Sequence, residues 1–254
     1  MPQTESSAEK TIVRIAAVAD LHFGRHPAEF YPPIFSEASA TADVLVLCGD
    51  VTDHGRVDEA QGLARAINQS SRVPVVGVLG NHDFESGHPD GVRDTLREAG
   101  VSMLDGDSVE IYGIGFAGVK GFCGGFGPRA LGPWGEATIK AFVQETLAEA
   151  LKLETALARL KSKTRVAVLH YSPVAATVEG EPLEIYPFLG SSRLEEPLTR
   201  YGVSAVFHGH AHHGRQEGRT SQGIVVYNVS LPLLQSGTPP RLMRVLTLSP
   251  QAAS

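Results

Sequence analysis

The chain has 254 residues, of which 42% are hydrophobic and 20% are charged. This length allows one large domain or two small ones with a sizeable buried core, and the composition excludes wholesale disorder. The formal net charge of −6 gives the chain no electrostatic reason to bind nucleic acid non-specifically. A small phosphorylated substrate is compatible with this charge, because bound cations reverse the local field.

The polar start of the chain and the lack of a membrane-spanning run favour a cytoplasmic protein. Residues 1–10 are polar and lack the apolar segment of a signal peptide, so we expect a loose N-terminal tail and then a single domain over residues 11–249. No apolar run approaches the roughly 18–20 residues that a membrane span needs. The two cysteines, Cys48 and Cys123, are too few for a disulfide framework.

Short apolar runs rich in β-branched residues recur along the chain and end at polar residues. The runs cover residues 11–20, 43–50, 73–81, 164–170 and 203–208. Each has the length of a strand and is almost continuously apolar, as expected for strands covered on both faces.

Four segments between or beside these runs are predicted to be helical. They cover residues 27–40, 56–69, 89–99 and 136–160. In the last of them Ile139, Phe142, Val143 and Leu147 begin a pattern that repeats about every 3.6 residues. Strands that alternate with helices predict an α/β or layered α+β domain with a central sheet.

Residues 113–128 are rich in glycine. They lack the GxxxxGK[ST] spacing of a phosphate-binding loop, and no helix follows them directly. We expect a loop here, either a flexible connection after a pair of strands or a flap over a site. Substrate specificity is expected to depend on residues 113–133 and 177–192.

The apolar runs end at aspartate, asparagine and histidine. In an open α/β sheet the loops past the carboxyl ends of the strands gather at one edge, where ligands bind. One aspartate after a strand is usually a helix cap or a turn residue, but five such strand ends predict a common site. The residues concerned are Asp20, His22, Asp50, Asn81, His82, His170, His208 and His210.

Carboxylate, amide and imidazole ligands together suit borderline or hard divalent metals. A structural zinc finger fits poorly, because these motifs contain no thiolate. Two aspartates, one asparagine and four histidines are too many for one tetrahedral site. They suit two metals that share a bridging carboxylate, which stabilises both the attacking and the leaving oxygen of a phosphoryl transfer.

The motifs DLH, GDVTD, GNHD, LHYSP and GHAH, in this order from Asp20 to His210, resemble the calcineurin-like metallophosphoesterase superfamily. The resemblance implies a four-layer α/β sandwich of two stacked mixed β-sheets flanked by helices. It also implies in-line attack by metal-bound hydroxide on a small phosphodiester or phosphomonoester, a nucleotide being one candidate. The cofactors would be two divalent metal ions, for which manganese, iron and zinc all tolerate this ligand set.

The resemblance assigns the ligands motif by motif. Asp50 would bridge the two metals. The first metal would be bound by Asp20, His22 and His210, and the second by Asn81, His170 and His208. Since His208 and His210 alternate along an extended backbone, they are expected to point to opposite sides and to serve different metals.

His82 resembles the family's residue that contacts the phosphate and helps to protonate the leaving oxygen. Imidazole suits this task because its ordinary pKa is about 6.5. Asp83 is expected to orient His82, so that both count as catalytic. Asp53 is expected either to orient a metal-binding group or to fill a turn or cap position. His212 and His213 are expected at the rim of the site.

Two other functions compete with this hypothesis. A metal-dependent nuclease is disfavoured by the net charge and by the lack of a basic run. A catalytically inactive scaffold is disfavoured because all seven ligand candidates and His82 are present. A phosphodiesterase is favoured over a phosphomonoesterase, although Tyr171 stands where some cyclic-nucleotide phosphodiesterases of the superfamily have a second histidine.

Overall fold

The computed structural model describes residues 10–251. The tail predicted over residues 1–10 therefore lies outside the described residues, apart from Lys10. The Nζ of Lys10 lies 2.7 Å from a carboxylate oxygen of Asp43, which ties the start of the described chain to the loop before the second strand. That residues 11–249 form a single domain stays a prediction.

The first three apolar runs form neighbouring strands of one sheet. Its order is β11-β1-β2-β3-β4, in which β1 to β4 are parallel and β11 is antiparallel to β1. The strands are β1 (Val13–Val18), β2 (Val44–Cys48), β3 (Val75–Val78), β4 (Ser102–Met103) and β11 (Arg244–Leu248). Because β1, β2 and β3 run in the same direction, the polar residues that follow them lie at one edge.

The fourth and fifth apolar runs lie in the second sheet. Its order is β5-β6-β7-β8-β10-β9, with β6, β7, β8 and β10 parallel and the two outer strands antiparallel to their neighbours. The strands are β5 (Asp107–Ile111), β6 (Ile114–Gly118), β7 (Thr164–Val168), β8 (Ala205–His208), β9 (Glu217–Arg219) and β10 (Val225–Asn228).

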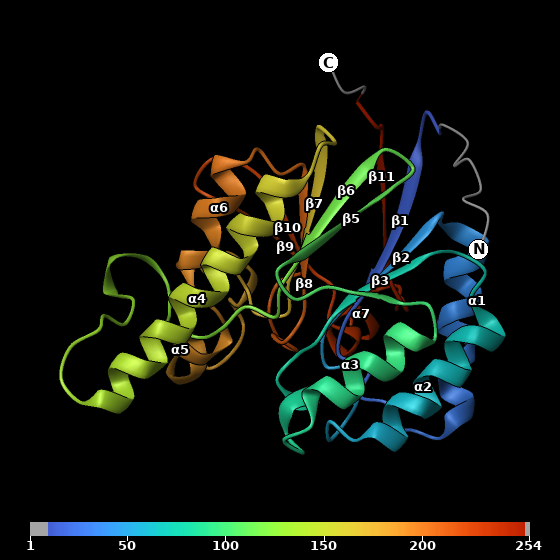
Figure 1. Cartoon of the computed structure of the whole chain (residues 1–254), viewed down its shortest axis with the longest axis horizontal. Coiled ribbons are helices and arrows are strands. Elements are labelled where there is room, and N and C mark those ends of the chain that lie inside the picture. Colours follow the sequence, from blue (N-terminus) through green and yellow to red (C-terminus); the bar gives the residue numbers. More distant parts are fainter. Residues whose placement is uncertain (1–9, 252–254) are drawn as a thin grey trace.

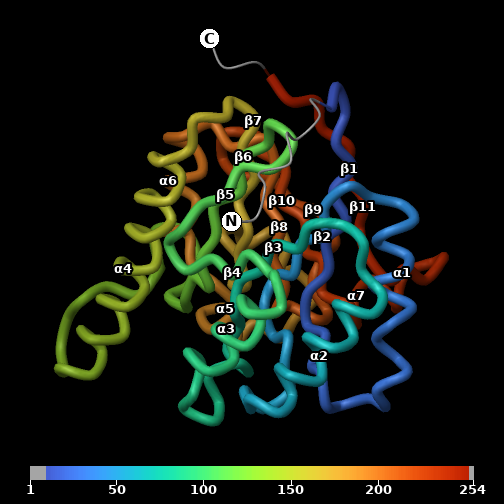
Figure 2. Tube along the Cα trace, turned by 45° about the vertical axis from the view of Figure 1, so that its right-hand side comes forward, coloured from blue at the N-terminus to red at the C-terminus, as the bar shows by residue number. Residues whose placement is uncertain are grey.

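The two sheets stack on each other, and helices cover their outer faces. Along β1, Ile15 and Ala17 pack between the sheets with Phe116 of β6, whereas Ala16 and Val18 pack under the helices of the first sheet. This alternation follows from strand geometry, and it explains why the run is apolar throughout. The helices α4 and α6 lie on the side opposite to α1 and α2 in both views (Figures 1 and 2). The predicted four-layer α/β sandwich is confirmed.

All four predicted helices are present. They are α1 (Pro32–Thr41), α2 (Val57–Ser70), α3 (Pro89–Glu98) and α4 (Ala137–Arg159). The helix predicted over residues 27–40 begins later, at Pro32, after a 3₁₀ turn over Ala28–Phe30. Proline is well suited to this start, because the first turn of a helix does not use its backbone N–H groups. Among the described residues, no helix combines the length and the apolar character that crossing a membrane requires.

Three short helices were not predicted. They are α5 (Tyr186–Leu189), α6 (Glu195–Arg200) and α7 (Leu231–Gln235).

The expectation of a loop over residues 113–128 is wrong for its first part. Ile114–Gly118 form β6, a fully buried strand inside the second sheet. Its glycines make room for neighbours, because a Cβ at Gly115 would lie 2.7 Å from Leu160 and one at Gly118 would lie 2.7 Å from Val78. Glycine thus marks close packing on this strand, and the loop begins only after it.

Candidate metal centre

The carboxyl ends of β1, β2 and β3 meet those of β7 and β8 at one edge of the stacked sheets. The two sheets touch here, since a Cβ at Gly49 would lie only 2.5 Å from the Nδ1 of His170. Most predicted ligands are removed from solvent: Asp20, His22, Asp50, His170 and His208 are buried, and Asn81 and His210 are half-buried. Buried carboxylates and imidazoles need partners, and the partners available here are mostly one another.

The backbone is strained at four of the predicted ligands. Among the described residues, five that are not glycine have a positive φ, and four of these are Asp20 (59°), His22 (45°), Asp50 (47°) and His210 (70°). Side chains other than glycine rarely adopt this conformation, which costs about 1–3 kcal/mol and persists where the surroundings enforce it. The strain therefore marks the site independently of the residue types.

Gly80, in the GNHD motif, leaves no room for a side chain. A Cβ there would lie 2.2 Å from the Oδ1 of Asp50 and 2.8 Å from the ring of His170. We expect Gly80→Ala to destabilise the protein by about 1–3 kcal/mol through overpacking and to displace both neighbours. Metal titration and urea unfolding of the variant measure the two effects. Gly87→Ala is the control for metal affinity alone, because a Cβ there meets nothing within 4 Å although its φ of 77° strains any side chain. A Gly80→Ala variant with normal metal affinity would contradict this packing.

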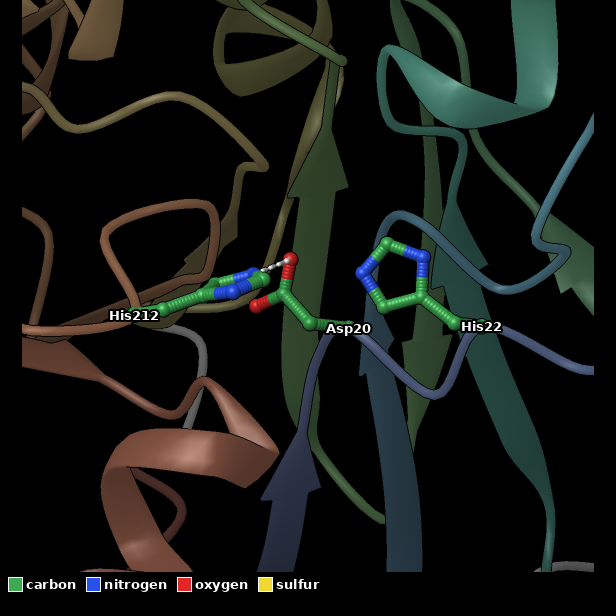
Figure 3. A group of neighbouring side chains, drawn as sticks. All are labelled: Asp20, His22 and His212. Carbon is green, nitrogen blue, oxygen red and sulfur yellow. Dashed lines mark ion pairs between the residues drawn. The ribbon is translucent and has the colours of Figure 1, made fainter. Parts of the chain in front are cut away.

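Asp20 lies between two imidazoles. Its Oδ1 is 3.3 Å from the Nε2 of His212, and Figure 3 shows the carboxylate between the rings of His212 and His22. Its carboxylate also accepts hydrogen bonds from the backbone N–H of His210. Burial acts to raise the pKa of Asp20, but the contact with His212 and the nearby imidazoles outweigh it and hold that pKa below the usual value. Together, Asp20, His22 and His212 form one group that could hold a metal ion.

His212 was expected only at the rim, so its contact with Asp20 was missed. Burial alone would lower the pKa of His212, but the contact with Asp20 raises it instead.

Asp50 belongs to two groups that could hold a metal ion. One consists of His22, Asp50 and His82, and the other of Asp50, His170 and His210. The two carboxylate oxygens face different neighbours: Oδ2 is 3.9 Å from the Nε2 of His22, and Oδ1 is 3.4 Å from the Nε2 of His170. A carboxylate placed in this way can bridge two cations.

His170 and Asn81 present lone pairs to each other. The Nδ1 of His170 lies 3.0 Å from the carbonyl oxygen of Cys48, which can only accept, so Nδ1 carries the proton. The Nε2 of the neutral ring is then an acceptor, and it lies 2.8 Å from the Oδ1 of Asn81, which is also an acceptor. Two acceptors that lie this close repel each other unless a cation binds both. This arrangement beside Asp50 therefore suits a metal ion.

The two ring nitrogens of His22 are buried and have no hydrogen-bond partner. Its Nδ1 faces the Oδ1 of Asp53 at 3.3 Å, which supports the prediction that Asp53 orients a metal-binding group. Its Nε2 points toward Asp50. Leaving such atoms unpaired costs about 1–3 kcal/mol each, and a bound metal at Nε2 would remove that cost.

The protonation states also suit a metal. Burial lowers the pKa of His22 to about 4, and it lowers those of His170 and His210 as well. These imidazoles are therefore neutral at pH 7, the form that binds metal. Burial, together with the charges of Asp20 and Asp83, raises the pKa of Asp50 well above its usual value. The residues present thus lack only the opposite charge that a divalent cation supplies.

His208 is the predicted ligand that the structure places apart from these groups. Its Nδ1 donates to the carbonyl oxygen of Gly209 at 2.8 Å, and its Nε2 accepts from the hydroxyl of Thr177 at 2.8 Å. Burial lowers its pKa to about 4, so this ring too is neutral. His210 is in the cluster and His208 faces Thr177, but the backbone between them is not extended as expected, because β8 ends at His208 and His210 has a φ of 70°.

His82 lies at the open side of the cluster. Its Nδ1 donates to the carbonyl oxygen of Asp53 at 2.8 Å, and its ring packs edge-on against His22 with 4.6 Å between the centroids. The backbone N–H of His82 donates to the Oδ1 of Asp50. The ring is thus fixed, and its Nε2 stays available for another partner.

The expectation that Asp83 orients His82 does not agree with the structure. Asp83 is completely buried, and its carboxylate accepts hydrogen bonds from the backbone of Val51, Thr52 and Gly80 and from the hydroxyl of Thr52. It therefore joins the GDVTD loop to the GNHD loop. The carbonyl of Asp53 takes the role predicted for Asp83, and a backbone group has no signature in the sequence.

We expect Asp83→Asn to destabilise the metal-free protein by about 2–4 kcal/mol, because an amide offers these donors one acceptor where the carboxylate offers two. Urea unfolding in a chelator measures this loss without a contribution from metal. The matched control is Asp58→Asn, which removes an exposed ion pair with Arg56 and should change stability by less than about 1 kcal/mol. Equal stability of the two variants would contradict the joining role.

The model of the calcineurin-like phosphoesterase family matches residues 13–214. The chain belongs to this family. Membership implies a metal-dependent phosphoester hydrolase that acts on phosphorylated substrates, and it confirms the superfamily assignment made from the five motifs. Among curated proteins, none matches the sequence.

Solved structures with this fold are similar over most of the chain. The phosphopantetheinyl hydrolase PptH from Mycobacterium tuberculosis has a TM-score of 0.67 and 19% identity, covering 94% of this chain and 96% of its own. TT1561 of Thermus thermophilus has a TM-score of 0.57 and 14% identity, and the similarity covers 94% of this chain and 99% of its own. GAP50 of Plasmodium, an anchor in the inner membrane complex, has a TM-score of 0.57 and 11% identity, and the similarity covers 94% of this chain and 82% of its own. At these identities the similarity establishes the fold alone.

Proposed function

We propose that this protein is a dinuclear phosphoesterase in which Asp50 bridges the two metal sites. The observation that supports this most is the position of Asp50, whose two oxygens face His22 on one side and His170 on the other. The proposed ligands are those given by the motifs: Asp20, His22, Asp50, Asn81, His170, His208 and His210. His212 is an additional candidate, because its Nε2 reaches Asp20.

The divalent ions would lower the pKa of a water molecule and neutralise charge on the phosphoryl oxygens. The chain's own residues do the rest. Asp50 fixes the backbone of His82, and the carbonyl of Asp53 holds the proton on the Nδ1 of His82. A second proton on this ring therefore sits on Nε2, from which it can pass to the leaving oxygen.

Hydrolysis of two simple esters tests this proposal. Manganese-loaded protein is expected to cleave bis-p-nitrophenyl phosphate or p-nitrophenyl phosphate, and faster cleavage of the former would support the preference for diesters that the sequence predicts. Because a similar structure is that of a phosphopantetheinyl hydrolase, an ester of that group belongs in the same series. Metal-loaded protein that cleaves none of the three would contradict the proposal.

A further inference from the structure

An apolar cavity of about 610 Å³ lies beside the metal centre. One wall is the loop that leads into α4, and the other is the segment around α5. In Figure 1 this loop extends past the lower end of α4, on the side away from the sheets. The backbone N–H of Gly124 in this loop donates to the carbonyl of Pro187 in α5 at 2.8 Å. Aromatic side chains from both walls face the cavity: Phe126, Trp134, Phe142, Tyr186 and Phe188. A cavity of this size and chemistry is typical of sites for small organic molecules.

The wall next to α5 is attached to the metal centre. The carbonyl oxygen of Phe188 lies 3.2 Å from the Nε2 of His210, a proposed metal ligand. The backbone N–H of Ser172, two residues after His170, donates to the carbonyl of Leu189 at 3.0 Å. The cavity and the proposed reaction centre thus share one stretch of chain, because Phe188 lines the cavity with its side chain and contacts His210 with its carbonyl group.

The cavity exposes large apolar side chains to solvent. Trp134 is 62% exposed, Leu183 74% and Phe188 55%. Isolated apolar residues on a surface are ordinary, but several that line one cavity favour a ligand that covers them. Leu151 on α4, which is 63% exposed and does not line the cavity, is an example of the isolated kind.

Arg129 is the one charged residue among those that line the cavity. Within residues 10–251 no carboxylate lies within 4.0 Å of its guanidinium, so its charge is available to a ligand. Guanidinium groups bind carboxylates and phosphates through paired hydrogen bonds. The cavity therefore favours an apolar group that carries an anionic substituent.

We propose that this cavity binds the organic group of the substrate, and that this group is apolar and bears an anionic substituent for Arg129. The proposal rests on the proposed phosphoesterase function. It assigns substrate selectivity to the residues around the cavity, whereas the metal ligands determine the reaction.

The single tryptophan of the chain, Trp134, lies in the cavity and reports its occupancy by fluorescence. The probes are methylphosphonate, hexylphosphonate and 6-phosphonohexanoate, titrated into manganese-loaded protein. Hexylphosphonate is expected to bind at least about tenfold more tightly than methylphosphonate, because it buries five more methylene groups. Equal affinities of the two would overturn the proposal.

Three variants locate the binding. Leu183→Ser should weaken hexylphosphonate binding at least about fivefold, and Leu151→Ser should leave it unchanged. Arg129→Gln should weaken the binding of 6-phosphonohexanoate and leave the binding of hexylphosphonate unchanged. An equal effect of the two leucine variants would overturn the apolar part of the proposal, and an equal effect of Arg129→Gln on both probes would overturn the anionic part.

The titration separates this proposal from the proposed function, because it needs no turnover. Cleavage of bis-p-nitrophenyl phosphate without tighter binding of hexylphosphonate would overturn the cavity proposal alone. A Trp134 emission shift that depends on protein concentration in the absence of probe would mean that a second copy covers the cavity, and this too would overturn it.

Discussion

Replacing Asp50 by asparagine is expected to lower kcat/KM for phosphoester hydrolysis by at least about 10³-fold and to remove bound metal. Asp50 is the carboxylate that faces both His22 and His170, and an amide carries no charge to balance two cations. Divalent metals supply several kcal/mol of charge stabilisation in such reactions, and each 1.36 kcal/mol is tenfold in rate. Metal analysis of the dialysed variant beside its kinetics measures both effects.

The control for this variant is Asp58→Asn, a change of the same chemistry at an exposed position on α2. It should keep both the metal content and the rate of the unmodified protein. An Asp50→Asn variant that retains two metals and normal activity would contradict the bridging role.

His82→Ala is expected to keep its metals and lose about 10²–10⁴-fold in turnover of esters with poor leaving groups. The ring has its Nδ1 bound to the carbonyl of Asp53, which leaves Nε2 for the leaving oxygen. The loss should shrink for p-nitrophenyl esters, because p-nitrophenolate leaves without protonation. A comparison of phenyl and p-nitrophenyl esters under single-turnover conditions measures this difference.

His88→Ala is the matched control, because His88 is exposed and lies outside the groups that could hold a metal. It should behave like the unmodified protein with both esters. An equal loss with phenyl and p-nitrophenyl esters in His82→Ala would remove His82 from the role of proton donor and leave it only a role in binding.

Much of the fold could be predicted from the sequence because both faces of the inner strands are buried. Residues 44–48, for example, are apolar at every position, which identifies the strand without knowledge of its neighbours. The glycine-rich β6 was missed for the opposite reason. Its small residues serve close contacts with Leu160 and Val78, partners that are distant in sequence.

Most of the candidate site could be predicted because parallel strands bring their carboxyl ends to one edge. The positions of Asp20, Asp50, Asn81 and His170 follow from this rule. The contacts of His208 and His212 do not, since the chain turns at His210 with a φ of 70°, and the contacts depend on that turn. The role of Asp83 also could not be predicted, because its partners are backbone N–H groups that any residue offers.

The most direct test of the bridged two-metal site is the anomalous difference density of a crystal of the manganese-loaded protein. We expect two peaks, one on the His22 side of Asp50 and the other on the His170 side, each within coordination distance of a carboxylate oxygen of Asp50. The same crystal structure would show whether His208 binds the second ion or keeps its hydrogen bond with Thr177. A single peak, or two peaks that Asp50 does not contact, would contradict the bridged site.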